Sequence, residues 1–141
     1  MSGFLLDTNC ISELVRPRPE PRVLRWIDAA DESLLFLSVL TLGEIRKGIA
    51  GLPQSRRRTH LESWFELDLR SRFAGRTLSI DYAVADGWAL LAAEARRKRT
   101  FLSAIDGLLA ATALEHNLTI VSRNVDDFAN TPVPILNPWE E

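Results

Sequence analysis

The sequence contains little cysteine and no long apolar run. Its 141 residues include one cysteine, Cys10, which excludes an intrachain disulfide framework and suits a reducing compartment. No uncharged stretch approaches the roughly 18–20 residues of a membrane helix, and the first residues lack the basic and apolar regions of a signal peptide. We therefore expect a single soluble, cytoplasmic domain over residues 1–141, with no membrane association.

Histidine is also scarce, and phosphate-binding loops are missing. His60 and His116 are isolated from each other and from Cys10, so the sequence offers no cluster of zinc ligands. Cys10 has no histidine nearby and is expected to be a packed thiol rather than a nucleophile. Neither common type of glycine-rich phosphate loop occurs. Zinc enzymes, cysteine nucleophiles and P-loop enzymes are disfavoured.

The formal net charge of −2 gives no global basic footprint for nucleic acid, but the charge is unevenly distributed. Residues 44–100 hold 12 basic and 7 acidic side chains, whereas residues 101–141 hold 1 basic and 6 acidic side chains. The runs Arg56–Arg58 and Arg96–Arg99 dominate the basic part. A solvated face and a cationic helix end explain them most simply. Contact with phosphate or an acidic partner is the alternative.

Short apolar runs alternate with helical patterns along the whole chain. Predicted strands cover residues 4–6, 34–37, 77–80, 118–121 and 134–136. The first predicted helix is capped by Thr8 and continues past Leu14. Further predicted helices cover residues 22–30, the segment from Ser38 to about Gly51, and residues 53–73, 82–99 and 103–116. Strands of about four apolar residues between helices predict a doubly wound α/β domain, whose parallel sheet of four to five short strands has helices on both faces.

Three acidic residues stand where such a sheet binds ligands, beyond the carboxyl ends of its strands. Asp7 ends the first strand, Glu44 follows the second by one to two helical turns, and Asp106 lies in the first turn of an almost entirely apolar helix. Structural roles are the alternatives: Asp7 in an Asx turn, Glu44 in solvent, and Asp106 in a capping pair with Ser103. Asp106 lies on an apolar helix face, where a carboxylate is costly to bury without a partner, and this cost favours a functional role for it.

Other polar residues follow the third and fourth predicted strands. Asp81 is expected to be a helix N-cap. The residues after the fourth strand include Ser122, Asn124, Asp126 and Asp127. The two aspartates either join a site or cap the turn toward Phe128. An aspartyl-phosphate enzyme is disfavoured, because its second aspartate would stand where this chain has Asn9.

Several carboxylates at one sheet edge would repel one another, and repulsion raises their pKa values unless a cation is present. None of Asp7, Glu44 and Asp106 has a basic residue directly beside it in the sequence. Mg²⁺ and Mn²⁺ are hard cations that take carboxylate oxygens, keep several waters and bridge to phosphate. The pattern therefore indicates a divalent cation of this kind.

The assembled motifs resemble those of PIN-domain ribonucleases, specifically the VapC and FitB-like toxins of type II toxin–antitoxin systems. The similar segments, in order, are Leu5-Leu6-Asp7-Thr8-Asn9 with Ile11-Ser12-Glu13, then Ser38-Val39-Leu40-Thr41-Leu42-Gly43-Glu44-Ile45, Ile105-Asp106-Gly107-Leu108-Leu109-Ala110-Ala111-Thr112-Ala113, Ser122-Arg123-Asn124-Val125-Asp126-Asp127-Phe128 and Asn137-Pro138-Trp139. The likeness runs from residue 4 to residue 139.

The resemblance implies a metal-dependent endoribonuclease. Asp7, Glu44 and Asp106 would hold Mg²⁺ or Mn²⁺, Glu44 would accept a hydrogen bond from the attacking water or act as general base, and Thr8 and Ser122 would orient ligands. Asn124 stands where the family often has a fourth acid, so it joins the candidate catalytic residues. The missing negative charge makes a second metal ion doubtful, and Asp127 is a candidate to replace that charge.

The resemblance also implies partners and leaves an alternative. Expected partners are RNA as substrate, a second copy in a homodimer, and a cognate VapB/FitA-like antitoxin that blocks the site, often with a basic side chain. Because Asn124 removes one negative charge, a non-catalytic PIN-fold module that binds RNA or protein is the alternative. A metal-dependent phosphatase is a more distant one.

Overall fold

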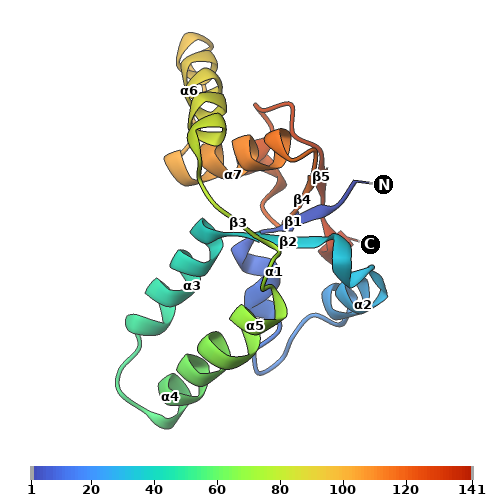
Figure 1. Ribbon diagram of the computed structural model, residues 1–141, viewed down its shortest axis with the longest axis vertical. Coiled ribbons are helices and arrows are strands. Elements are labelled where there is room, and N and C mark those ends of the chain that lie inside the picture. Colours follow the sequence, from blue (N-terminus) through green and yellow to red (C-terminus); the bar gives the residue numbers. More distant parts are fainter. Residues whose placement is uncertain (1, 141) are drawn as a thin grey trace.

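The structure, a computed structural model that describes residues 2–140, is built on one parallel sheet of five short strands (Figure 1). The strands are β1 (Phe4–Leu6), β2 (Leu35–Ser38), β3 (Thr77–Leu78), β4 (Thr119–Val121) and β5 (Ile135–Leu136). Their order is β3-β2-β1-β4-β5, and every neighbouring pair is parallel. The predicted fold class is confirmed, with strand ends shifted by one or two residues.

Helices connect the strands and cover both faces. The α-helices are α1 (Thr8–Glu13), α2 (Pro21–Ala29), α3 (Val39–Ala50), α4 (Arg56–Ser63), α5 (Arg70–Arg72), α6 (Tyr82–Arg97) and α7 (Ala104–Glu115). Shorter turns of tighter helix are η1 (Glu32–Leu34), η3 (Val125–Phe128) and η4 (Pro138–Glu140), and η2 (Trp64–Leu69) is a π-helical segment. No helix within residues 2–140 has both the length and the hydropathy to cross a bilayer.

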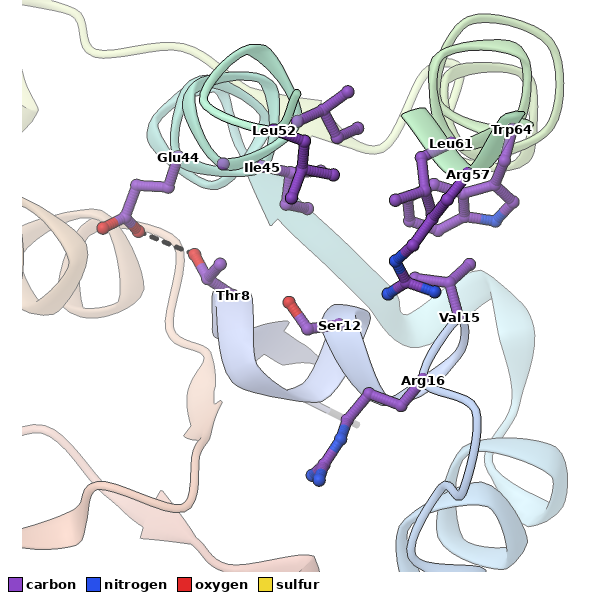
Figure 2. Close-up of a pocket in the computed structure, with 12 residues that line it drawn as sticks. Thr8, Ser12, Val15, Arg16, Glu44, Ile45, Leu52, Arg57, Leu61 and Trp64 are labelled. Carbon is purple, nitrogen blue, oxygen red and sulfur yellow. Dashed lines mark hydrogen bonds between the residues drawn. The ribbon is translucent and has the colours of Figure 1, made fainter. Parts of the chain in front are cut away.

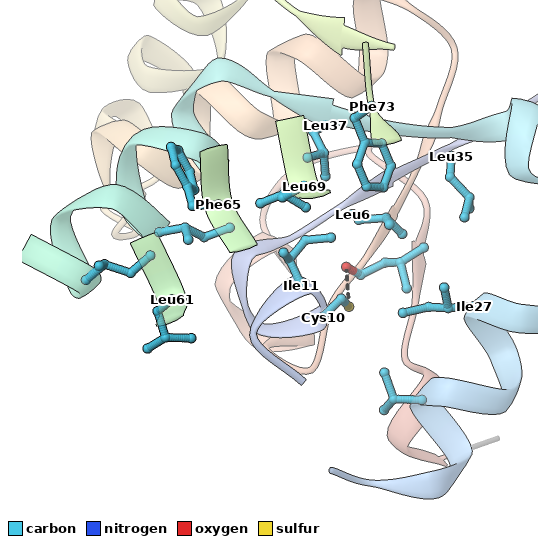
Figure 3. Close-up of a cluster of buried hydrophobic side chains, with 14 of the residues drawn as sticks. Leu6, Cys10, Ile11, Ile27, Leu35, Leu37, Leu61, Phe65, Leu69 and Phe73 are labelled. Atoms are coloured by element: carbon cyan, nitrogen blue, oxygen red, sulfur yellow. Dashed lines mark hydrogen bonds between the residues drawn. The ribbon is translucent and has the colours of Figure 1, made fainter. Parts of the chain in front are cut away.

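The two faces of the sheet carry separate apolar clusters. Leu5 and Leu6 of β1 are both buried, and because successive strand side chains point to opposite faces they belong to different clusters. Leu6 packs with residues of α1, α2, α3 and the α4–α5 segment (Figure 3), whereas Leu5 packs with residues of α7. In Figure 1, α6 and α7 accordingly lie on one side of the sheet and α1 to α5 on the other.

The predicted helix over residues 53–73 is interrupted, which corrects the sequence interpretation. The helix begins at Arg56, because Ser55 caps it, and changes to π-helical winding at Trp64. Its buried residues, Leu61, Phe65, Leu69 and Phe73, repeat every four positions. In an α-helix, with about 3.6 residues per turn, side chains four positions apart would rotate gradually away from the core. The wider π winding keeps these side chains on the core-facing side.

The start of α1 also differs from the prediction. Asp7, not Thr8, is the N-cap: its side chain accepts the Thr8 N–H. Asp7 also directly follows the central strand β1, and its own N–H donates to the Val121 carbonyl of the neighbouring β4 at 3.0 Å. The strand order reverses direction between β1 and β4, so Asp7 and Ser122 meet at the switch point where such sheets bind ligands.

The packing of α6 on α7 depends on a residue without a side chain. Gly107 in α7 is buried, and a Cβ added there would stand 2.8 Å from Cδ1 of the Trp88 indole in α6. Gly48 in α3 is a matched helical glycine, whose Cβ would meet nothing within 4 Å.

Gly107→Ala is expected to lower the free energy of unfolding by about 1–3 kcal/mol, because overpacking against a rigid indole outweighs the better helix propensity of alanine. Gly48→Ala is expected to raise it by up to about 1 kcal/mol. Urea denaturation of both variants and the parent measures the difference. Equal stability of the two variants would contradict the close contact.

Candidate acidic site at the switch point

The Asp7 carboxylate is held by both strands of the switch point. Only 8% of the residue is exposed. Its Oδ1 accepts the Thr8 N–H at 2.8 Å, and its Oδ2 accepts the hydroxyl of the fully buried Ser122 at 2.7 Å. These donors fix the orientation of both carboxylate oxygens.

Asn9 joins the same two loops, a role that the sequence interpretation missed. Its Nδ2 donates to Ser122 Oγ at 3.2 Å and to Asp7 Oδ2 at 3.4 Å, while its Oδ1 accepts the Arg123 N–H at 3.3 Å. The sequence signal was its place two residues after Asp7, which served only to disfavour a phosphoenzyme. The structure shows instead that Asn9 ties the chain after β1 to the chain after β4.

Glu44 reaches the site from α3. The side chain of Ser38 caps that helix by accepting the Leu40 N–H at 3.0 Å, which sets where α3 leaves the sheet. Glu44 is half-buried, and its Oε1 accepts the Thr8 hydroxyl at 2.6 Å (Figure 2). Thr8 therefore orients the Glu44 carboxylate.

Asp106 comes from the first turn of α7. Ser103 is the N-cap, and its Oγ accepts the Asp106 N–H at 3.1 Å. Burial raises the pKa of the Asp106 carboxyl, the Ser103 hydroxyl opposes that rise, and the charges of Asp127 and Glu44 add to it. The capping role is therefore present at this position, and Asp106 also lies close enough to Asp127 and Glu44 to be affected by their charges.

One hollow of about 380 Å³ brings the predicted acids together. It is lined by Asp7, Thr8, Asn9, Glu44, Asp106, Asn124 and Asp127. Asp127 thus supplies a carboxylate beside Asn124. The capping role considered for Asp126 and Asp127 is wrong, because η3 starts after Asn124 without a side-chain cap bond.

The electrostatics of the hollow favour a cation. Burial raises the pKa of the Asp7 carboxyl, the Ser122 and Thr8 donors oppose that rise, and the charges of Glu44 and Asp106 add to it. The lining contains no lysine, arginine or histidine, and its ionisable groups are all carboxylates. Oxygen donors without a basic counterion suit a hard divalent cation. Within residues 2–140, however, no three His, Cys, Asp or Glu side chains already stand close enough to share one ion.

The basic runs are partly engaged elsewhere. Nη1 of Arg58 donates to the Leu52 carbonyl at 3.0 Å, whereas Arg57 lines a second hollow of about 350 Å³ that also reaches Thr8 and Glu44 (Figure 2). In the second run, Arg97 and Lys98 pair with Glu94.

Cys10 behaves as predicted. It is buried, its Sγ donates to the Val121 carbonyl at 3.2 Å, and burial raises the pKa of its thiol.

Comparison with known proteins gives matches over almost the whole chain. A model of the PIN domain matches residues 4–134. VapC ribonuclease Y4jK of Sinorhizobium fredii is 38% identical over 97% of this chain and 98% of its own length. Toxin FitB of Neisseria gonorrhoeae is 37% identical, with 98% of this chain and 99% of FitB covered.

Solved structures agree with these sequence matches. The crystal structure of FitAcB from Neisseria gonorrhoeae superposes with a TM-score of 0.94 at 37% identity, and covers 98% of this chain and 99% of that chain. The structure of FitAB bound to the IR36 DNA fragment gives a TM-score of 0.92 at 37% identity, over 96% and 95% of the two chains.

Asp7→Asn is expected to stabilise the metal-free protein by about 1 kcal/mol at pH 8, because it removes a buried charge that other acids repel. The raised pKa means that the charged carboxylate disfavours the fold. Its cost is present above that pKa and vanishes below it, so the advantage of the variant should grow as pH rises from about 4 to 8. Thermal unfolding in EDTA across this range measures it.

The matched control is Asp86→Asn on α6, an exposed acid outside the acidic hollow, which should change stability by less than about 0.5 kcal/mol. A variant at position 7 that is less stable than the parent at pH 8 would refute the argument from burial.

Proposed function

The chain belongs to the PIN-domain family, and from that premise we propose that it is the toxin of a type II toxin–antitoxin system, a metal-dependent endoribonuclease that hydrolyses RNA phosphodiester bonds. The single observation that carries the proposal is the hollow in which Asp7, Glu44 and Asp106 meet without a basic residue in the lining. The names of the relatives, a VapC ribonuclease and a FitB toxin, support the same activity.

The metal is proposed to be Mg²⁺, with Mn²⁺ as a substitute, and Asp7, Glu44 and Asp106 would hold it. The ion would polarise the scissile phosphate and lower the pKa of the attacking water. The donor set fits, because it is made of carboxylate oxygens whose mutual repulsion a divalent cation relieves. Asn124 adds an amide oxygen, and Asp127 adds charge at the same rim.

The chain's own residues prepare the site for this reaction. Ser122 and Thr8 hold the Asp7 oxygens in place through the hydrogen bonds described above. The Thr8 hydroxyl also fixes Oε1 of Glu44, which would accept a hydrogen bond from the attacking water or take its proton. These are positions held before substrate arrives, which is how preorganised groups lower a barrier.

A cognate VapB/FitA-like antitoxin and a second copy of the chain are the proposed protein partners. The FitAcB and FitAB structures, which this chain resembles at 37% identity, support the antitoxin. A guanidinium of that partner could pair with the acids in place of the metal. We place the protein in the cytoplasm, with its RNA substrate.

The alternative is a PIN-fold module that binds RNA or protein without cutting. It is favoured by Asn124, which replaces a fourth acid, and by acids that do not already surround one point within residues 2–140. Asp127 weighs against it. Titration calorimetry with Mg²⁺ and Mn²⁺ separates the two functions, since the module should bind neither ion.

The purified chain is expected to cleave RNA with Mg²⁺ and to lose that activity in EDTA. Asp106→Asn and Glu44→Gln should each reduce the rate by at least about 100-fold, through loss of a metal ligand or of the general base. Asp86→Asn, outside the hollow, should cut like the parent. Gel-based cleavage assays measure the rates. Cleavage that is unchanged both by EDTA and by Asp106→Asn would refute the metal mechanism.

A further inference from the structure

Arg123 stands apart from every other basic residue of the chain. It is the one basic residue among residues 101–141, a segment with six acidic side chains. It is the second residue after β4, and its guanidinium carbon lies 5.7 Å from the centroid of the Trp139 ring. Trp139 is 8% exposed, and its backbone N–H donates to Asn137 Oδ1 at 2.9 Å. The guanidinium therefore rests on an anchored aromatic surface, although the residue itself is exposed.

The backbone at Arg123 is tied to the acidic site. Its N–H donates to Asn9 Oδ1 at 3.3 Å, and the next N–H, from Asn124, donates to Ser122 Oγ at 3.0 Å. Ser122 in turn donates to Asp7. The start of the Arg123 side chain is thus fixed relative to the carboxylates.

The space in front of Arg123 adjoins the acidic hollow. A hollow of about 510 Å³ is lined by Arg123, Asn124, Val125, Asp126, Asp127, Asn137 and Glu140. Asn124 and Asp127 line the acidic hollow as well, so the two spaces share a wall. Although three carboxylates line the hollow with it, Arg123 forms no ion pair with any residue from 2 to 140.

We propose that Arg123 binds a phosphate of the RNA strand adjacent to the scissile one and so holds the strand across the acids. The inference rests on the proposed function, because it takes RNA as the substrate. An anionic strand entering a hollow whose ionisable groups are all carboxylates needs a cation beside that hollow as well as the metal. A planar guanidinium offers paired N–H donors that match phosphate oxygens.

Arg123 is the basic residue in the hollow that adjoins the acids through Asn124 and Asp127. Arg57 lines a further hollow, which shares Thr8 and Glu44 with the acidic one (Figure 2). A strand lying over the acids would therefore have a guanidinium in two of the adjoining hollows. This adjacency to the acids favours the substrate over the antitoxin as the occupant of the Arg123 hollow.

The test compares Arg123→Gln, Arg123→Lys and the control Arg70→Gln, an exposed arginine outside all these hollows. Binding of a labelled single-stranded RNA oligonucleotide is measured by fluorescence anisotropy with Ca²⁺ at several salt concentrations. Arg123→Gln should bind roughly tenfold more weakly. Its slope of log affinity against log salt should shrink by about 0.7, the value for one phosphate contact on a single strand.

Arg123→Lys keeps the charge but loses the planar fork, so it should recover the salt slope and only part of the affinity. Arg70→Gln should match the parent in both. Unchanged affinity and slope in Arg123→Gln would overturn the proposal, and so would an equal loss in Arg70→Gln. Weakened antitoxin binding with intact RNA binding would overturn it too, and would assign Arg123 to the protein partner.

Cleavage in Mg²⁺ and in EDTA, measured on the same parent preparation, separates this inference from the proposed function. A parent that binds RNA but never cuts it contradicts the ribonuclease proposal, while the anisotropy series still decides the role of Arg123. A parent that cuts RNA, with an Arg123→Gln variant that binds as tightly as the parent, contradicts the inference alone.

Discussion

The site depends on one constraint, the seating of the Asp7 carboxylate at the end of the central strand. β1 pairs with β2 on one side and β4 on the other, so its register is fixed twice. Leu5 and Leu6 bury into clusters on opposite faces, and a slip by one residue would exchange those faces. The carboxylate position therefore follows from core packing, and the donors from Thr8 and Ser122 complete its orientation.

That seating opposes the stability of the metal-free fold. Burial raises the pKa of Asp7, and the charges of Glu44 and Asp106 raise it further. The donors around Asp7 are all neutral, so they orient the charge without cancelling it. A carboxylate seated in this way lowers the stability of the metal-free fold, and the two apolar clusters of the sheet offset that cost. The same burial and repulsion would favour the divalent cation proposed above.

Much of this could be predicted from the sequence because it is local. Alternating apolar runs predicted the parallel sheet, and strand-end positions selected Asp7 and the region after β4. What could not be predicted depends on long-range geometry. The π winding at Trp64–Leu69 depends on the core against which the segment packs. The role of Asn9 depends on Ser122, which lies 113 residues away in the sequence. The sequence named Asp127 as a candidate for the site, but its approach to Asp106 depends on the folded sheet edge.

The distribution of cations shows why the net charge of −2 says little about a nucleic-acid substrate. The dense basic runs are partly neutralised: Arg58 lies near Glu62, and Arg97 and Lys98 pair with Glu94. The acidic last segment instead holds one isolated arginine, Arg123, beside the carboxylates. Since attraction between charges falls with distance and is screened by salt within roughly 10 Å, one cation next to the acids would act on a strand bound there more strongly than cations that lie farther away.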